Sequence, residues 1–170
     1  TRQRVERLLN HDRKDIDLKE IKLSVMRFIN PPKFPEDIKD LPDEEWKPIT
    51  KIDGVKTAKG YFISNKGRVC IARDVTKLEV TKTIRKLIMC KPDKNGRIRV
   101  NIKFVEGEVA RRHFYVNTLM GRFWVINKKP NEYNVVSYRN PDRMDDNSVD
   151  NLFWEAKSTS LLRSRAQEDS

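Results

Sequence analysis

Residues 133–160 read YNVVSYRNPDRMDDNSVDNLFWEAKSTS, and the interpretation of the whole chain depends on this stretch. The apolar run from Tyr133 to Tyr138 is typical of a strand, because Val and Tyr are enriched in sheets. Acidic and amide residues follow as a polar loop, and Asn151 to Trp154 then predicts the beginning of a short helix. The stretch therefore predicts a strand, a loop and a helix joined in one small unit.

The positive charge of the chain is concentrated in its middle. The 170 residues carry a formal net charge of +11, and the pI is about 9.7. Residues 45–134 hold 21 Lys and Arg against 8 Asp and Glu, whereas residues 1–44 hold ten of each kind and 135–170 hold five against seven. A basic excess of this kind makes a polyanion the first partner to consider. We therefore expect DNA as a partner, contacted mainly through its backbone.

The sequence gives no sign of a disulfide framework or of a membrane segment. Cys70 and Cys90 lie far apart and match no metal-binding spacing. Two isolated cysteines are typical of a reducing compartment. No apolar run approaches the roughly 20 residues that a membrane-spanning helix needs, and no signal-peptide pattern is present. We expect an intracellular protein without membrane contacts.

The first 44 residues predict a helical arm followed by a proline-rich linker. Apolar residues recur at the spacing of one helix face at Leu18, Ile21, Val25 and Phe28. Asp17 can cap this helix, Pro31 ends it, and a shorter helix is indicated around residues 5–9. The arm either binds a partner or packs on the rest of the chain. The balanced charge of residues 1–44 favours neither alternative.

Short strands and turns dominate the sequence after residue 45. Apolar residues on both sides of an Asn-Lys-Gly turn at 65–67 predict a hairpin. Further strands are expected at 86–89, 97–104 and 110–116, and a helix from about Asn117. The chain is therefore predicted to be α+β, with short antiparallel strands and hairpins and an N-terminal helical arm.

The strand expected at 97–104 alternates strictly between apolar and basic or amide residues. Ile98, Val100, Ile102 and Phe104 then face one side, and Arg97, Arg99, Asn101 and Lys103 face the other. A basic face on an antiparallel ribbon can follow a phosphate backbone, although most charged strand faces are simply solvated. The predicted DNA-binding residues are Lys82, Arg85, Lys86, Lys91, Lys94, Arg97, Arg99 and Lys103.

Five motifs in order resemble those of phage HNH homing endonucleases that carry a NUMOD-type N-terminal module. They lie at 45–49 (EWKPI) with 60–69 (GYFISNKGRV), 95–100 (NGRIRV), 116–123 (VNTLMGRF), 135–138 (VVSY) and 146–154 (DNSVDNLFW). The resemblance implies a ββα, HNH-like core over residues 111–162, after a basic antiparallel β module over 45–110. Residues 1–44 have no counterpart in the family, and residues 163–170 are expected to form a flexible tail.

The residues at the family's active-site positions differ from those that its chemistry uses. In the family, an Asp and an Asn bind one divalent metal and a neighbouring His acts as general base. The resemblance aligns Ser137, Tyr138, Ser160 and Asn117 with the family's active-site positions, and a one-residue shift would place Arg139 where the His is expected. Serine is a poor ligand for a hard cation without a carboxylate, and the ordinary tyrosine pKa is near 10. We therefore expect no metal, no cofactor and no enzymatic activity.

Other residues could restore such a site. His11 and His113 are the two histidines of the chain, and Asp142, Asp145 and Asp146 lie at loop spacing. His113 is four residues from Asn117, which is roughly 13 Å along a strand. Acidic loop residues of this kind more often cap a following helix than bind a metal. A divergent but active metal-dependent nicking endonuclease therefore remains an alternative.

The resemblance, the basic middle and the added arm together indicate a phage regulator of transcription. The chain is similar to staphylococcal-phage inhibitors of host RNA polymerase that bind the housekeeping sigma factor. The expected function is inhibition of host transcription through sigma and nearby DNA, in the cytoplasm of the infected bacterium. The arm or the acidic C-terminal segment would contact sigma. A DNA-binding repressor and a structural or capsid-associated protein are the remaining alternatives.

Overall fold

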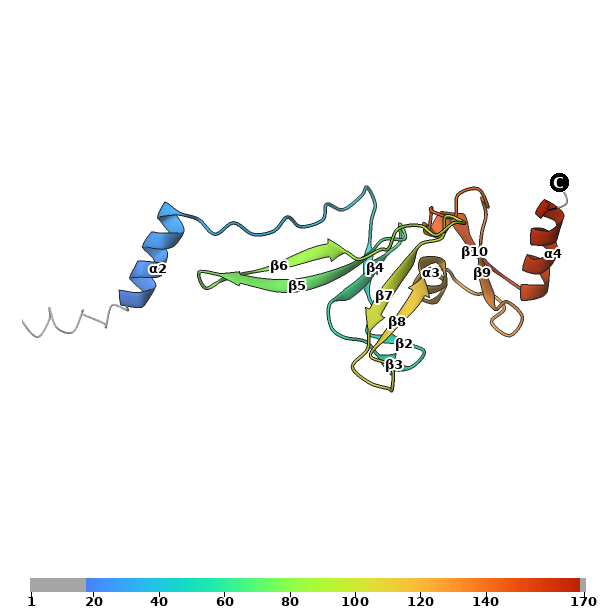
Figure 1. Cartoon of the computed structure of the whole chain (residues 1–170), viewed down its shortest axis with the longest axis horizontal. Helices are drawn as coiled ribbons and strands as arrows, with labels where there is room; N and C mark the ends of the chain where they lie inside the picture. The colour runs from blue at the N-terminus through green and yellow to red at the C-terminus, as the bar shows by residue number, and fades with distance from the viewer. Residues whose placement is uncertain (1–17, 169–170) are drawn as a thin grey trace, which may run out of the picture. The chain divides into compact units, whose positions relative to one another are not determined.

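The computed structural model describes residues 18–168, in which helices and short antiparallel strands are mixed as the sequence predicts (Figure 1). The described residues form two compact units. The first comprises residues 18–36 and 74–83, and the second comprises 37–73 and 84–168. The expected helix at 5–9, the capping residue Asp17 and the histidine His11 lie outside the described residues. None of the described helices has both the length and the apolar character needed to cross a lipid bilayer.

The first unit contains helix α2 (Leu18–Ile29), which the sequence predicts, and the end of the β5–β6 hairpin. Arg27 Nε donates a 2.8 Å hydrogen bond to the carbonyl oxygen of Leu78 in the hairpin turn, and Lys19 forms a 3.1 Å ion pair with Glu79. No α2 residue is buried. The helix therefore keeps its apolar residues exposed in the described part of the chain.

The second unit contains a sheet with the strand order β1-β4-β5-β6. Its members are β1 (Trp46–Pro48), β4 (Tyr61–Ser64), β5 (Val69–Lys77) and β6 (Val80–Leu87). The β4–β5 pairing confirms the predicted hairpin. Strand β6 begins six residues earlier than the strand expected at 86–89. The sequence has no turn signal here, because Leu78 and Glu79, which both have positive φ, are not residues typical of a tight turn.

The β4–β5 turn is joined to the polar loop that precedes β10. Gly67 has a φ of 72°, and an added Cβ would lie 2.4 Å from the backbone of Asn147. The N–H of Val149 also donates a 3.0 Å hydrogen bond to the carbonyl oxygen of Asn65. Glycine is therefore required here both by the backbone conformation and by the close approach of the loop.

The predicted alternation over residues 97–104 is confirmed in the next hairpin. Strand β7 (Arg99–Lys103) pairs antiparallel with β8 (Arg111–Tyr115), and Val100 and Ile102 are fully buried. Beside it, β2 (Lys51–Ile52) and β3 (Val55–Lys56) form a two-stranded pair. Val100 and Ile102 anchor the β7–β8 hairpin in the core, and the side chains that alternate with them lie on its outer face.

The segment before β7 contributes a backbone contact from a cysteine. The N–H of Cys90 donates a 2.8 Å hydrogen bond to the carbonyl oxygen of Arg99. Cys90 is exposed, whereas Cys70 on β5 is buried, and neither forms a disulfide. Burial raises the pKa of the Cys70 thiol to about 11, so this thiol is protonated at neutral pH.

Helix α3 (Val116–Phe123) follows β8 directly and packs on the hairpin formed by β9 (Val135–Tyr138) and β10 (Leu152–Glu155). A Cβ added at Gly121 of α3 would lie 2.3 Å from Val136 Cγ2 and 2.7 Å from Trp154 Cζ2. The helix thus approaches the hairpin closely. The fully buried residues Leu119, Met120 and Leu152 belong to the core that these elements share with the larger sheet.

The predicted helix from Asn151 is wrong. Asn151 ends a 3-10 turn (Val149–Asn151), β10 follows, and helix α4 begins only at Lys157. The Asn151 amide closes the polar loop: it accepts from the N–H of Asn140 (3.0 Å) and donates to the carbonyl oxygens of Arg143 and Asp146. The four residues after it gain ladder bonds to β9, which outweigh the local helix signal.

Helix α4 (Lys157–Glu168) also replaces most of the flexible tail expected at residues 163–170. None of its residues is buried, but it contacts β9. The boundaries 1–44, 45–110 and 111–162 expected from the sequence stay predictions. The two units of the structure divide the chain differently, because the β5–β6 hairpin extends from one into the other.

Candidate nucleic-acid interface and the adjoining polar pocket

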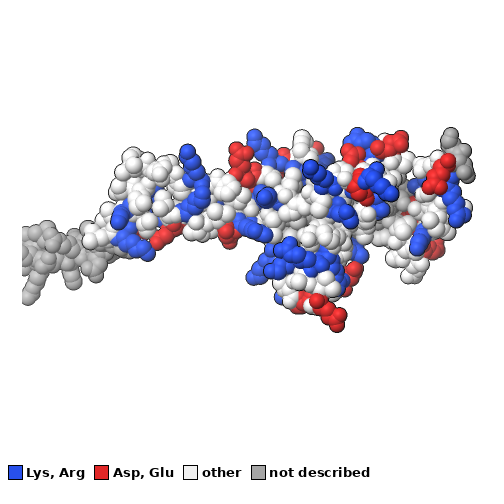
Figure 2. Space-filling view, in the orientation of Figure 1, with Lys and Arg blue, Asp and Glu red and all other residues white. Residues whose placement is uncertain are grey.

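The outward face of the β7–β8 hairpin carries a row of basic side chains, which we call the basic ribbon: Arg97, Arg99, Lys103 and Arg111. Arg99 lies opposite Tyr115, and Lys103 lies opposite Arg111, so these side chains share one face. Arg99, Lys103 and Arg111 are exposed. Figure 2 shows Lys and Arg side chains gathered over this hairpin.

The basic ribbon keeps its positive charge available. Among the residues that the structure describes, no carboxylate forms an ion pair with any of its four members. The Arg97 guanidinium lies 3.6 Å from the ring centroid of Tyr115, and that of Arg99 lies 5.9 Å from it. The ring therefore orients two guanidinium groups without neutralising them.

Arg85, another predicted DNA-binding residue, is in a different environment. Its guanidinium donates to Asp37 at 2.9 Å and to Asp40 at 2.7 Å, and also to the carbonyl oxygen of Ile38. These hydrogen bonds raise the pKa of the Arg85 guanidinium further above its usual range. Arg85 thus holds the acidic linker against the sheet, and its charge is already compensated.

The other predicted DNA-binding residues do not belong to β7. Lys82 lies in the first unit with its ammonium 5.0 Å from the Phe34 ring, whereas Lys86, Lys91 and Lys94 are exposed in the second unit. Of the eight predicted residues, the β7–β8 pairing places Arg99 and Lys103 on one face, and Arg97 adjoins them through its contact with the Tyr115 ring. Arg111 was missed from the sequence, although the expected antiparallel pairing of its strand could have placed it beside Lys103.

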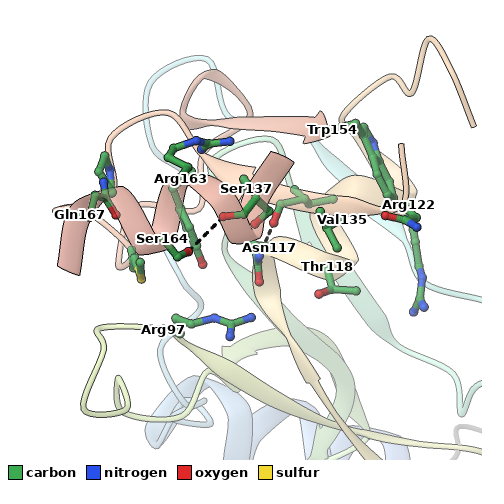
Figure 3. A pocket seen from close by; sticks show the side chains of 16 residues that line it. Arg97, Asn117, Thr118, Arg122, Val135, Ser137, Trp154, Arg163, Ser164 and Gln167 are labelled. Atoms are coloured by element: carbon green, nitrogen blue, oxygen red, sulfur yellow. Dashed lines mark hydrogen bonds between the residues drawn. The ribbon is translucent and has the colours of Figure 1, made fainter. Parts of the chain in front are cut away.

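The four positions that the resemblance singled out line one pocket of about 430 Å³. Ser137 and Tyr138 come from β9, Asn117 from α3 and Ser160 from α4. Figure 3 shows the pocket with Arg97 on one side and Ser164 and Gln167 of α4 on the other. Three arginines also line it: Arg122 and Arg163 are paired with Asp53 and Glu155, whereas Arg97 forms no ion pair with a described carboxylate. The pocket is therefore polar and basic.

A buried carboxylate beside the pocket was not foreseen from the sequence. Glu155 is 5% exposed, and its two oxygens accept hydrogen bonds from Ser137 Oγ and Arg163 Nη2. Glu155 ends β10 and Arg163 lies in the second turn of α4. The pairing of Glu155 with Arg163 could not be predicted from the sequence, because the helix expected from Asn151 would have included Glu155, which instead ends a strand.

Tyr138 and Asn117 make hydrogen bonds within the fold. Burial raises the pKa of Tyr138 to about 12, and its hydroxyl donates a 3.0 Å hydrogen bond to Asn147 Oδ1. The Asn117 Nδ2 donates to the carbonyl oxygen of Val136 at 2.9 Å, whereas its Oδ1 is buried and has no hydrogen-bond partner among the described residues. Tyr138 is therefore a neutral phenol near pH 7 rather than a proton acceptor.

The side chains around the pocket do not provide suitable ligands for the divalent metal that the resemblance implies. The Glu155 carboxylate is held by a hydroxyl and a guanidinium, and the charge of Arg163 opposes a cation there. Within residues 18–168, no group of three His, Cys, Asp or Glu could hold a metal ion. The residues present suit an anion better.

The loop aspartates and His113 lie outside the pocket. Asp145 forms a 2.9 Å ion pair with Arg143, and Asp146 Oδ1 accepts from the N–H of Ser148, while Asp142 is exposed. His113 is exposed on the face of the basic ribbon. Asp146 thus closes a local turn and does not cap the 3-10 turn that follows, and none of these side chains lines the pocket.

Comparison with known proteins gives one solved structure. Neither a scan against protein-family models nor a search of curated proteins finds a match. The structure is similar to one titled "DNA binding and cleavage by the HNH homing endonuclease I-HmuI", with 20% sequence identity and a TM-score of 0.49. The match covers 73% of this chain and 59% of that one.

This similarity corrects one expectation from the sequence. The chain was expected not to be an enzyme, because the family's metal ligands and general base are replaced. The structure that it resembles is titled as that of an endonuclease that cleaves DNA, so the expectation is not kept.

Proposed function

We propose that the chain binds double-stranded DNA, with the basic ribbon against the phosphate backbone. The observation that carries the proposal is the difference between paired and unpaired arginines. Arg85 is compensated by Asp37 and Asp40, whereas Arg99, Lys103 and Arg111 have no carboxylate partner among the described residues. A two-stranded antiparallel ribbon is narrow enough to enter the major groove or to follow its edge.

This mode of binding has a measurable electrostatic signature. Each phosphate that a cation neutralises releases condensed counterions, so four contacts give a slope of log K against log salt of about −3.6. Backbone contacts carry little sequence information, and binding to duplexes of unrelated sequence is expected to be similar. The ribbon therefore explains affinity, and any sequence preference would need other residues.

The test measures the affinity of the full chain for a labelled duplex between 50 and 200 mM salt. In the double variant R99Q/K103Q we expect at least tenfold weaker binding and a slope reduced in magnitude by about 1.8. The matched control K59Q/K128Q removes the same charge from exposed positions outside the ribbon. Equal losses in both variants would mean that the ribbon is not the DNA-binding face.

The adjoining pocket supplies a place for one phosphate of the bound strand. Arg97 belongs both to the ribbon and to the pocket lining, and Arg163 lies on the opposite element. Guanidinium groups bind phosphate oxygens through paired, directional hydrogen bonds. A backbone that follows the ribbon could thus enter the pocket at Arg97.

The full chain and the control variant K59Q/K128Q also allow a test of metal-dependent nicking, the alternative that the sequence leaves open. Supercoiled plasmid is incubated with the protein and Mg²⁺ or Mn²⁺, and the nicked form is quantified. Nicking that is lost in S137A and E155Q but kept in K59Q/K128Q would assign cleavage to the pocket. If the protein binds the plasmid but the plasmid stays supercoiled, the assay shows DNA binding without cleavage.

As a second candidate function, we propose transcription regulation through a protein partner, the host sigma factor. Helix α2 supports it, because Phe28 is 89% exposed and Leu18 and Ile29 are exposed by 78% and 75%. Exposed apolar groups of this kind mark protein contacts. Co-elution of the chain with purified sigma, lost in I29E but not in K22Q, would support this function, and separate elution would count against it.

A further inference from the structure

A second hollow lies on the C-terminal hairpin, separate from the basic ribbon. We call it the aromatic groove; its volume is about 590 Å³, and it lies between the end of the β9–β10 hairpin and α4. Its lining combines three aromatic residues with two arginines and one carboxylate: Tyr133, Phe153, Trp154, Arg139, Arg163 and Glu155, the last of which binds Arg163. A groove of this size fits a small organic ligand or a single nucleotide.

The rings of the aromatic groove are held in place but not sealed into the core. Tyr133, Phe153 and Trp154 are all half-buried. The Trp154 Nε1 donates a 2.9 Å hydrogen bond to the carbonyl oxygen of Val125, which fixes the indole. Phe153 belongs to a ladder pair with Ser137, so its backbone is equally constrained. The groove therefore offers partly exposed aromatic surface to a ligand, and the hydrogen bond of Trp154 fixes one of its three rings.

Its two guanidinium groups differ in their availability. They lie 5.4 Å (Arg139) and 5.1 Å (Arg163) from the centroid of the Phe153 ring. Arg163 is bound to Glu155, whereas Arg139 is exposed and forms no ion pair with any described carboxylate. Only Arg139 therefore carries an uncompensated charge beside the rings.

We propose that the aromatic groove binds one unpaired nucleotide of a nucleic-acid strand. The base stacks against the rings of Phe153 and Tyr133, and Arg139 contacts the adjacent phosphate. Aromatic platforms bordered by cations bind single bases in a sequence-tolerant manner, because every base has a π face. This inference rests on the proposed DNA binding and adds to it a site for a base outside the double helix.

The test compares a perfect duplex with the same duplex carrying one extrahelical thymidine, using the full chain and fluorescence anisotropy. We expect the bulged duplex to bind about tenfold more tightly, since stacking of one base contributes on this order. The preference should disappear in F153L and in Y133L and fall in R139Q. It should persist in R165Q, which removes the same charge from an exposed α4 position outside the groove.

The outcomes separate this inference from the proposed function. Equal affinity of the unaltered chain for both duplexes overturns the groove but leaves DNA binding intact. A preference that survives in F153L, Y133L and R139Q also overturns it. Failure to bind either duplex overturns both. A thermal unfolding curve for each variant identifies loss of fold, and R139Q, at an exposed position, keeps the test informative if a ring variant unfolds.

Discussion

At the scale of single residues, Glu155 is the carboxylate on which the polar pocket depends. It is almost fully buried, and Ser137 and Arg163 provide its hydrogen bonds. A buried carboxylate that loses its cation is costly, whereas loss of both charges is much less so. The pair therefore has a structural role that can be measured without any ligand.

We expect R163Q to lower the free energy of unfolding by about 2 kcal/mol, a figure below the usual range for buried pairs because the Arg163 side chain is 39% exposed. The double variant R163Q/E155Q should recover part of this loss, because the unpaired charge is gone. Urea unfolding of the unaltered chain, R163Q, E155Q and the double variant measures these values. A double variant less stable than the sum of the single changes would contradict this account of the pair.

The linker aspartates give a residue-scale prediction about pH. The hydrogen bond from Arg85 holds the pKa of Asp37 below its ordinary 3.8, and that of Asp40 is lowered for the same reason. A depressed folded-state pKa contributes stability above the ordinary value and loses it as pH falls through the depressed one. The linker should therefore stay attached at pH 5 and detach only below about pH 4.

Trp46 reports this detachment, because its Nε1 donates a 2.9 Å hydrogen bond to Asp40 Oδ1. The indole N–H resonance of Trp46, assigned with W46F, should shift as the pH falls below 4. In R85Q the shift should begin at higher pH, since the carboxyl groups lose their cation. An unchanged midpoint in R85Q would show that Arg85 does not set the titration.

At the scale of elements, the contact between the β4–β5 turn and the polar loop depends on the absence of a side chain at Gly67. Gly54 has the similar φ of 78°, but no atom lies within 4 Å of an added Cβ there. The two glycines therefore separate backbone strain from steric exclusion. A left-handed conformation alone costs an alanine about 1–2 kcal/mol.

We expect G54A to lose about 1 kcal/mol of stability and G67A to lose about 3 kcal/mol or more, because the loop must move away from the turn. Thermal or urea unfolding measures the difference. The amide resonances of residues 145–149 should shift in G67A and not in G54A. Equal losses of stability in G54A and G67A would mean that the polar loop can move away from the turn without lowering stability.

Elements with a strong local pattern could be predicted from the sequence. The alternation over residues 97–104 and the periodicity of α2 each specify one structure, and both are confirmed. Strand β10 could not be predicted, because LFWE has no alternation and its choice between helix and strand is made by pairing with β9. The β5–β6 hairpin was missed in part because residues 78 and 79 do not resemble a turn.

The candidate site was predictable in its location more than in its chemistry. The four aligned positions do meet in one pocket, because α3 and α4 both contact β9. The pairing of Glu155 with Arg163 depends on where α4 begins, and the availability of each arginine depends on distant carboxylates. Neither the Glu155–Arg163 pairing nor the availability of an arginine can be predicted from a local stretch of sequence.

At the scale of the whole molecule, the net charge of +11 is a poor guide to where a polyanion binds. Charges that are already paired contribute little to the local field that a phosphate experiences. Arg85 and Arg99 are both arginines on strands of the second unit, but within residues 18–168 only Arg85 has carboxylate partners. The same substitution at the two positions should therefore have different effects.

We expect R99Q to weaken duplex binding several-fold and to reduce the salt slope by about 0.9 in magnitude, as for the loss of one phosphate contact. R85Q should leave both quantities nearly unchanged, or strengthen binding slightly if the freed aspartates move away. Anisotropy titrations at three salt concentrations compare the two. A larger effect of R85Q than of R99Q would move the interface to the sheet that contains β6.

The two cysteines give this chain a chemical handle that needs no engineering. The Cys70 thiol is buried and protonated at neutral pH, so a maleimide reacts at the exposed Cys90 first. Cys90 is hydrogen-bonded through its backbone to Arg99, beside the basic ribbon. A dye attached there would sit where the phosphates of an arriving strand are expected, and its emission would record docking in real time. Cys70, in turn, would become reactive only when the sheet opens, so the rate at which it is labelled measures how often the sheet unfolds.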